Sequence, residues 1–120
     1  MKYLLVFGVL VVAGCLSGEE GKLQVINETE ESFQYRVVVF GENEKIDSAR
    51  HHALGNENAT VLMPGESSTV DLVGKYEEGG KIAVFIYKES DSGLKMVKSE
   101  VMGVKYLQDT FWSAVVIDSL

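Results

Sequence analysis

The chain has 120 residues, of which 46% are hydrophobic and 24% are charged, a length and balance that suit one globular domain. Its net charge of -7 repels phosphate groups, so the composition argues against nucleic acid as a partner. A single cysteine cannot form an internal disulfide, so a folded domain has to be held by its apolar core.

The N-terminal segment is typical of a leader rather than of a fold element. A basic residue, Lys2, precedes an apolar run from Tyr3 to Leu16. This run is shorter than the roughly 20 residues that a membrane-spanning helix needs, and it is apolar on nearly every side. We therefore expect a cleavable signal peptide over residues 1–14.

The end of this leader carries a short motif, Val12-Ala13-Gly14-Cys15. It resembles the lipobox of prokaryotic membrane lipoproteins: an aliphatic residue, a small residue, Gly or Ala, and then Cys. The resemblance implies that the thiol of Cys15 carries a diacylglyceryl-type lipid and that cleavage makes this residue the mature N-terminus. We therefore expect a membrane protein that is lipid-anchored and faces outside the cytoplasm. An ordinary cleaved signal peptide and an uncleaved anchor are the alternatives.

The residues after the leader divide into a tether and a domain. Residues 15–21 hold the lipidated Cys and a stretch rich in glycine and glutamate, which we expect to form a flexible tether. From residue 22 to residue 120, apolar residues alternate or form short runs between turn residues, the pattern of β-strands. The expected strands are KLQVIN (22–27), ESFQYRVVVFG (31–41), NATVLM (58–63), PGESSTVDLV (64–73), KIAVFIYK (81–88), LKMVKSEVM (94–102) and DTFWSAVVID (109–118).

Turn residues separate these strands. Met63-Pro64-Gly65-Glu66 fits a type II turn, because Pro presets φ at the second position and Gly supplies a positive φ at the third. Residues 89–93 have the length and composition of a hairpin loop. About seven short strands punctuated in this way predict an all-β sandwich.

The stretch EKIDSARHHALGN, which begins at residue 44, does not follow the strand pattern. Its apolar residues lie at helical spacing, and they are Ile46, Ala49, Ala53 and Leu54. Asp47 could cap the start of a helix, and Gly55 could end it. The pattern over residues 44–54 therefore favours a short helix or helical turn, with a strand as the alternative.

Two stretches resemble the immunoglobulin-like or fibronectin-III-like domains of prokaryotic surfaces. LQVINETEESFQYRVVVFG is similar to their first hairpin, and VLMPGESSTVDLV to their strand, Pro-Gly-Glu corner and strand. The resemblance implies a small immunoglobulin-like β-sandwich that serves as an adhesive, spacer or docking module. The Cys…Trp…Cys spacing of antibody domains is absent, because Trp112 is the only tryptophan.

The sequence offers few groups for chemistry. His51 and His52 are candidate metal ligands, but adjacent side chains diverge on both strands and helices, so one ion would need further ligands such as Asp47. No nucleophile elbow or phosphate-binding loop is present in the sequence. We therefore expect no cofactor and no enzymatic activity, and two solvated histidines rather than a metal site.

Two sequons make Asn27 and Asn58 candidate glycosylation sites, since each is followed by a threonine at the second position. Among the aromatic residues, Phe85 and Tyr87 share a face opposite Ile82, Val84 and Ile86. Core packing is the expected role of both sets, and an outward apolar face that binds a partner is the alternative.

The expected function is a binding or docking module with an envelope protein as a possible partner. The alternatives are a structural spacer or coat lipoprotein and a metal- or ligand-binding accessory protein.

Overall fold

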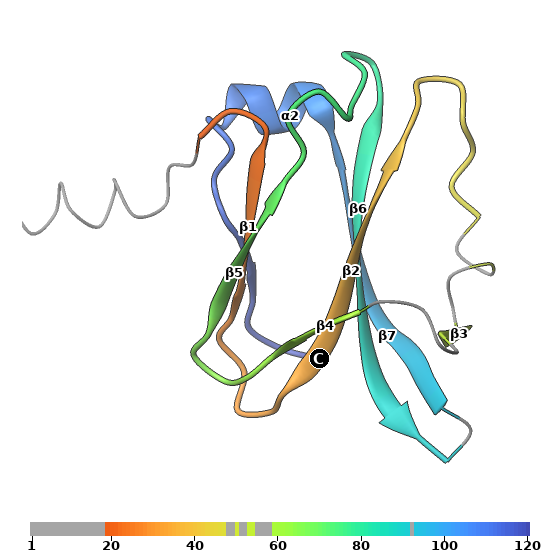
Figure 1. Ribbon diagram of the computed structural model, residues 1–120, viewed down its shortest axis with the longest axis vertical. Helices are drawn as coiled ribbons and strands as arrows, with labels where there is room; N and C mark the ends of the chain where they lie inside the picture. The colour runs from red at the N-terminus through yellow and green to blue at the C-terminus, as the bar shows by residue number, and fades with distance from the viewer. Residues whose placement is uncertain (1–18, 48–49, 51–52, 55–58, 92) are drawn as a thin grey trace, which may run out of the picture.

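The computed structural model describes residues 19–120, with the exception of 48–49, 51–52, 55–58 and 92. These residues form two β-sheets packed face to face, with a short helix across one end (Figure 1). A three-stranded sheet has the order β5-β1-β8, and a five-stranded sheet has the order β3-β7-β6-β2-β4. The expected all-β sandwich is therefore confirmed.

The bounds of the elements follow the expected pattern closely in most places. The three-stranded sheet consists of β1 (Lys22–Asn27), β5 (Ser67–Asp71) and β8 (Val115–Ile117). The five-stranded sheet consists of β2 (Phe33–Phe40), β3 (Ala53–Leu54), β4 (Thr60–Leu62), β6 (Lys81–Ser90) and β7 (Gly93–Gly103), and the helix is α2 (Val104–Asp109). Neighbouring strands are antiparallel except for β1 and β8, which run parallel with Val25 opposite Val115.

Alternating side chains build the core between the sheets. On β1, Leu23 and Val25 are fully buried, whereas the residues that alternate with them, Lys22, Gln24 and Ile26, are half-buried. On β6, the inward set consists of Ile82, Val84 and Ile86. Because side chains alternate across a strand, each sheet contributes one apolar face to this shared core.

A second apolar layer covers the outer face of the five-stranded sheet. Phe85 and Tyr87 point to this face and are fully buried. Part of their cover comes from Ile46 and Ala59, which lie on the connection between β2 and β4. Figure 1 shows this connection passing on the side of the five-stranded sheet that faces away from β1 and β5. Both faces of β6 are thus buried within one chain, so Phe85 and Tyr87 do not form an exposed partner-binding face.

The turn at residues 63–66 has the expected type II form. The Glu66 N–H donates to the Met63 carbonyl oxygen at 3.0 Å, and Gly65 has a φ of +82°. The Glu66 carboxylate also accepts a hydrogen bond of 2.7 Å from the Met63 N–H. This corner carries the chain from β4 in one sheet to β5 in the other.

The structure differs from expectation at two places. In the 44–54 stretch, the favoured helix is limited to one helical turn, in which the Arg50 N–H donates to the Asp47 carbonyl oxygen at 3.1 Å, and the alternative, a strand, follows as β3. β3 pairs with the start of β7, which satisfies backbone groups that a helix would have satisfied internally. In the 109–118 stretch, only β8 is a strand, because Phe111 and Trp112 have φ values of +54° and +53° and turn the chain after α2.

Candidate binding site at one end of the sandwich

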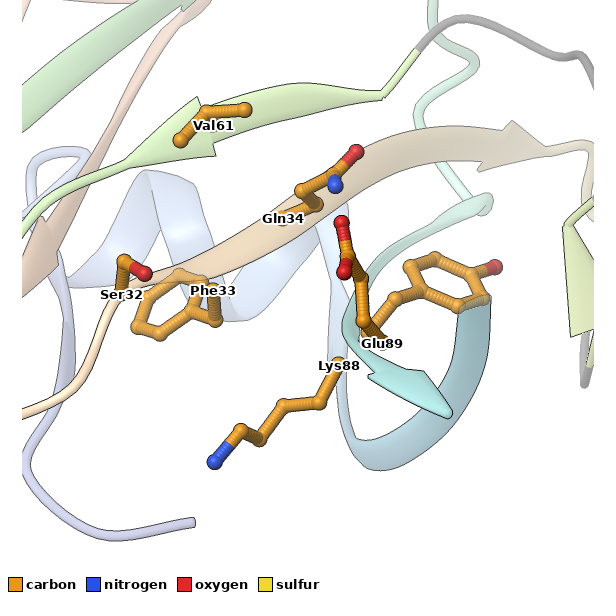
Figure 2. Close-up of a pocket in the computed structure, with 7 residues that line it drawn as sticks. Ser32, Phe33, Gln34, Val61, Lys88 and Glu89 are labelled. Atoms are coloured by element: carbon orange, nitrogen blue, oxygen red, sulfur yellow. The ribbon is translucent and has the colours of Figure 1, made fainter. Parts of the chain in front are cut away.

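A hollow of about 350 Å³ lies on the outer face of the five-stranded sheet, where β2 begins between β4 and β6. It is lined by residues of three strands and the turn before β2, namely Ser32, Phe33, Gln34, Val61, Tyr87, Lys88 and Glu89. Figure 2 shows the Glu89 carboxylate reaching toward Gln34 from the neighbouring strand. The hollow is large enough for a small ligand or a side chain of a partner.

Strand register brings these residues together. Gln34 lies directly opposite Val61 of β4 and directly opposite Tyr87 of β6. Directly opposite residues of antiparallel strands project to the same face, and Glu89 follows Tyr87 by two positions on the same strand. No sequence motif marks this group, because its members come from three separate segments that meet only through pairing.

Two charged residues line the hollow, Lys88 and Glu89. The Lys88 ammonium group forms an ion pair with the Glu31 carboxylate, and Figure 2 shows its side chain extending away from Glu89. No ion pair to Glu89 occurs among the residues that the structure describes. The site therefore combines a hydroxyl, an amide and a carboxylate around an apolar residue, Val61. This set suits a neutral or cationic polar group and disfavours an anion.

The described residues offer little for catalysis or metal binding. No group of three or more His, Cys, Asp or Glu side chains within the described ranges could hold a metal ion. The hollow supplies one carboxylate, from Glu89, and neither a histidine nor a cysteine.

The opposite end of the sandwich carries exposed aromatic side chains. Phe111 is 72% exposed, whereas its neighbour Trp112 is buried and packs against Tyr76 with ring centroids 5.2 Å apart. A smaller hollow of about 150 Å³ is lined by Glu20 together with Phe111 and Trp112, so these residues lie beside the start of the domain. Tyr106 on α2 is exposed as well.

Most of the site residues expected from the sequence lie outside the described residues. These are the motif Val12, Ala13, Gly14 and Cys15, the histidines His51 and His52, and the sequon residue Asn58. Their lipidation, metal-binding and glycosylation roles stay predictions.

Asn27 is described, and its side chain is fully buried. Its amide nitrogen donates to the carbonyl oxygens of Glu31 and Leu62, both at 2.9 Å, and its amide oxygen accepts from Thr29. In the folded domain, this amide is engaged in internal hydrogen bonds. Glycosylation there stays a prediction, and the side chain has a clear structural role.

No protein-family model, curated protein or solved structure matches the chain. Within the described part of the chain, no helix has the length and apolar character needed to span a membrane. The chemistry of the residues themselves is therefore the basis for assigning a function.

Proposed function

We propose that this protein is a lipid-anchored extracytoplasmic binding module that is tethered through Cys15 and recognises a ligand at the far end of its β-sandwich. The motif Val12-Ala13-Gly14-Cys15 supports the anchor. The two stretches that resemble immunoglobulin-like domains support a docking role without catalysis. The observation that carries the proposal is that the chain enters the sandwich at one end and the larger hollow lies at the other.

The short tether limits how far the entry end can be from the bilayer. Residues 15–21 span at most about 25 Å when extended. β1 begins at Lys22 and runs away from this end to Asn27 (Figure 1). The turn over residues 28–32 then leads into β2, whose first residues line the hollow. A lipid on Cys15 would therefore keep α2 near the membrane and present the hollow outward.

Exposed aromatic residues at the entry end fit this orientation. Phe111 presents an exposed ring beside Glu20 of the tether, and Tyr106 is exposed on α2 at the same end. Aromatic side chains are suited to a membrane–water interface because they combine an apolar ring with, in tyrosine, a polar tip. Phe111 also adopts a left-handed backbone conformation that is unusual for a bulky residue, which is a common feature of functional positions.

The ligand would be a small neutral or cationic polar group. Glu89 and Gln34 provide its hydrogen-bonding partners, and Val61 provides an apolar contact. The acidic net charge of the chain adds a long-range preference against anions.

Intact mass analysis of membrane-extracted protein tests the anchor. The wild-type chain should lack residues 1–14 and carry the added mass of acyl chains, whereas Cys15→Ser should carry neither change. A wild-type chain that retains its leader and has no added mass contradicts the anchor.

Chemical-shift mapping tests the ligand site, with a panel of neutral sugars, primary amides and alkyl amines as probes. Binding should shift the amide signals of Ser32, Gln34 and Val61, and both Gln34→Ala and Glu89→Gln should weaken it. Gln108→Ala, at the entry end, is the matched control and should leave binding unchanged. Chemical-shift changes confined to the end where the chain enters, or no binding by any member of the panel, would count against a ligand site in the larger hollow.

A further inference from the structure

β7 is a long strand with one largely unpaired side. It contains 11 residues and pairs with β6 along its length. On its other side, β3 pairs only with Leu94 and Lys95. Over residues 96–102, no other strand of the described chain pairs with this side. Such an edge presents a row of backbone N–H and C=O groups that another strand can pair with.

The sequence of this edge is self-complementary. It reads Met96-Val97-Lys98-Ser99-Glu100-Val101-Met102. Read outward from Ser99, the same residue types recur on both sides, except that Lys98 on one side corresponds to Glu100 on the other. Two copies paired antiparallel about Ser99 would therefore place Lys98 of each copy directly opposite Glu100 of the other. Met96 and Met102 do not face each other in this way, because Met96 packs against the outer apolar layer and Met102 against the core.

In the monomer, the charged and apolar side chains of this edge are already placed where a second strand could contact them. Lys98 and Glu100 share one face of β7, with Nζ and Oε1 3.9 Å apart. After pairing, each Lys98 ammonium group would lie near two carboxylates, that of Glu100 on its own strand and that of Glu100 on the other copy. Val97 and Val101 are each 47% exposed, and pairing would cover them. Cross-strand pairs of both kinds stabilise antiparallel sheets.

The same pattern disfavours neighbouring registers. A shift by two residues in either direction places Lys98 opposite Lys98 of the other copy, or Glu100 opposite Glu100. Like charges directly opposite each other are destabilising. A shift by one residue would match the core face of one sheet with the outer face of the other. The register centred on Ser99 therefore pairs unlike charges and keeps both core faces on one side.

A β-bulge lies at one end of this segment. Ile86 pairs with Lys98 and Tyr87 with Met96, which leaves Val97 as the extra residue of β7. Bulges are common at sheet edges, where they limit the length of strand that can pair. This bulge confines regular pairing to a short segment around Ser99.

We infer that two copies of this chain associate through their β7 edges, antiparallel and about a two-fold axis at Ser99, so that their five-stranded sheets form one continuous sheet. The interface is isologous: the same surface of each copy contacts the other. The β7 edge used in this association is separate from the hollow between β4, β2 and β6.

Charge reversal gives a direct test, using the full chain in mild detergent and light scattering coupled to size-exclusion chromatography. The wild type should be a dimer. Lys98→Glu and Glu100→Lys should each raise the dimer dissociation constant by about tenfold or more, because each variant places like charges opposite each other. An equimolar mixture of the two variants should restore the dimer, and so should the double variant Lys98→Glu/Glu100→Lys, in which every pair is again of unlike charge.

Lys95→Glu is the matched control, since it makes the same charge change on β7 at a position whose other side is already paired with β3; it should remain dimeric. Circular dichroism establishes that each variant is folded, which matters because Lys98 also donates to the Ser119 carbonyl oxygen at 3.1 Å. A monomeric wild type, a dimer that survives both single reversals, or a mixture of folded single variants that stays monomeric would each overturn the inference.

Discussion

The side-chain amide nitrogen of Asn27 donates a hydrogen bond of 2.9 Å to the backbone carbonyl oxygen of Leu62, which lies 35 residues farther along the chain. Asn27 ends β1 in one sheet, and Leu62 ends β4 in the other. The backbone of Asn27 adds a bond to the Gly65 N–H at 2.8 Å. One buried polar residue therefore links the two sheets and the type II corner between them.

Replacing this residue should destabilise the domain. Asn27→Ala leaves the buried carbonyl oxygen of Leu62 without its side-chain donor and removes one of the two donors to the Glu31 carbonyl oxygen, which should lower the free energy of unfolding by about 2–3 kcal/mol. Urea denaturation followed by circular dichroism measures the change. Asn43→Ala, at an exposed position, should stay within about 0.5 kcal/mol of the wild type. Equal effects of the two substitutions would show that the buried network has no special role.

A second bond between the sheets joins the Tyr35 hydroxyl on β2 to the Ser68 hydroxyl on β5, with oxygens 2.6 Å apart. Tyr35→Phe should cost about 1 kcal/mol, a typical net contribution of a hydrogen bond. Ser68→Ala should cost as much or more, because it leaves the phenol of the buried Tyr35 without this partner. In a double-mutant cycle, the two losses should sum to more than the loss in the double variant. Strict additivity would indicate that the two hydroxyl groups do not interact in solution.

The outer apolar layer should contribute to stability as strongly as the core between the sheets. Phe85→Ala removes a fully buried ring and should lower the free energy of unfolding by about 3–5 kcal/mol. Phe111→Ala removes a ring that is 72% exposed, so thermal unfolding should barely change. If Phe85→Ala instead left the melting temperature unchanged, the outer face would be open in solution and free to meet a partner.

Two adjacent glycines should respond differently to the same substitution. A Cβ atom at Gly80 would lie 2.5 Å from the Phe40 carbonyl oxygen, a backbone atom that cannot easily move. At Gly79 it would meet the Glu42 carboxylate at 2.6 Å, and that exposed side chain can rotate away. Gly80→Ala should therefore cost about 1–3 kcal/mol, and Gly79→Ala less than about 1 kcal/mol. Chemical denaturation of the two variants side by side gives the comparison, and the reverse order would contradict this packing.

Strands could be predicted from the sequence wherever a local pattern determines the structure. Alternation identified β1, and the Pro64-Gly65 pair identified the corner after β4, because its conformation requires a residue that accepts a positive φ. The helix α2 was missed. It has six residues, no side-chain cap at Gly103 and no acidic residue in its first turn, so it lacks the usual signals of a helix start. Its buried residues Val104 and Leu107 are too few to establish a helical period.

The larger hollow, at the start of β2, could not be predicted from the sequence for a different reason. Gln34, Val61 and Glu89 are unremarkable in their own segments, and only the register of β2 with β4 and β6 brings them to one place. Burial of Phe85 and Tyr87 likewise depends on where the connection after β2 lies. A sequence that is apolar on both faces of a strand predicts that both faces are covered, but not by which segment.

The parallel pairing of β1 with β8 has a consequence for how the protein is made. β1 is the first strand of the domain, and its two neighbours come from residues 67–71 and 115–117. A nascent chain that has not reached residue 117 therefore lacks the strand that closes one side of β1. Until synthesis passes that point, the domain cannot complete its native structure.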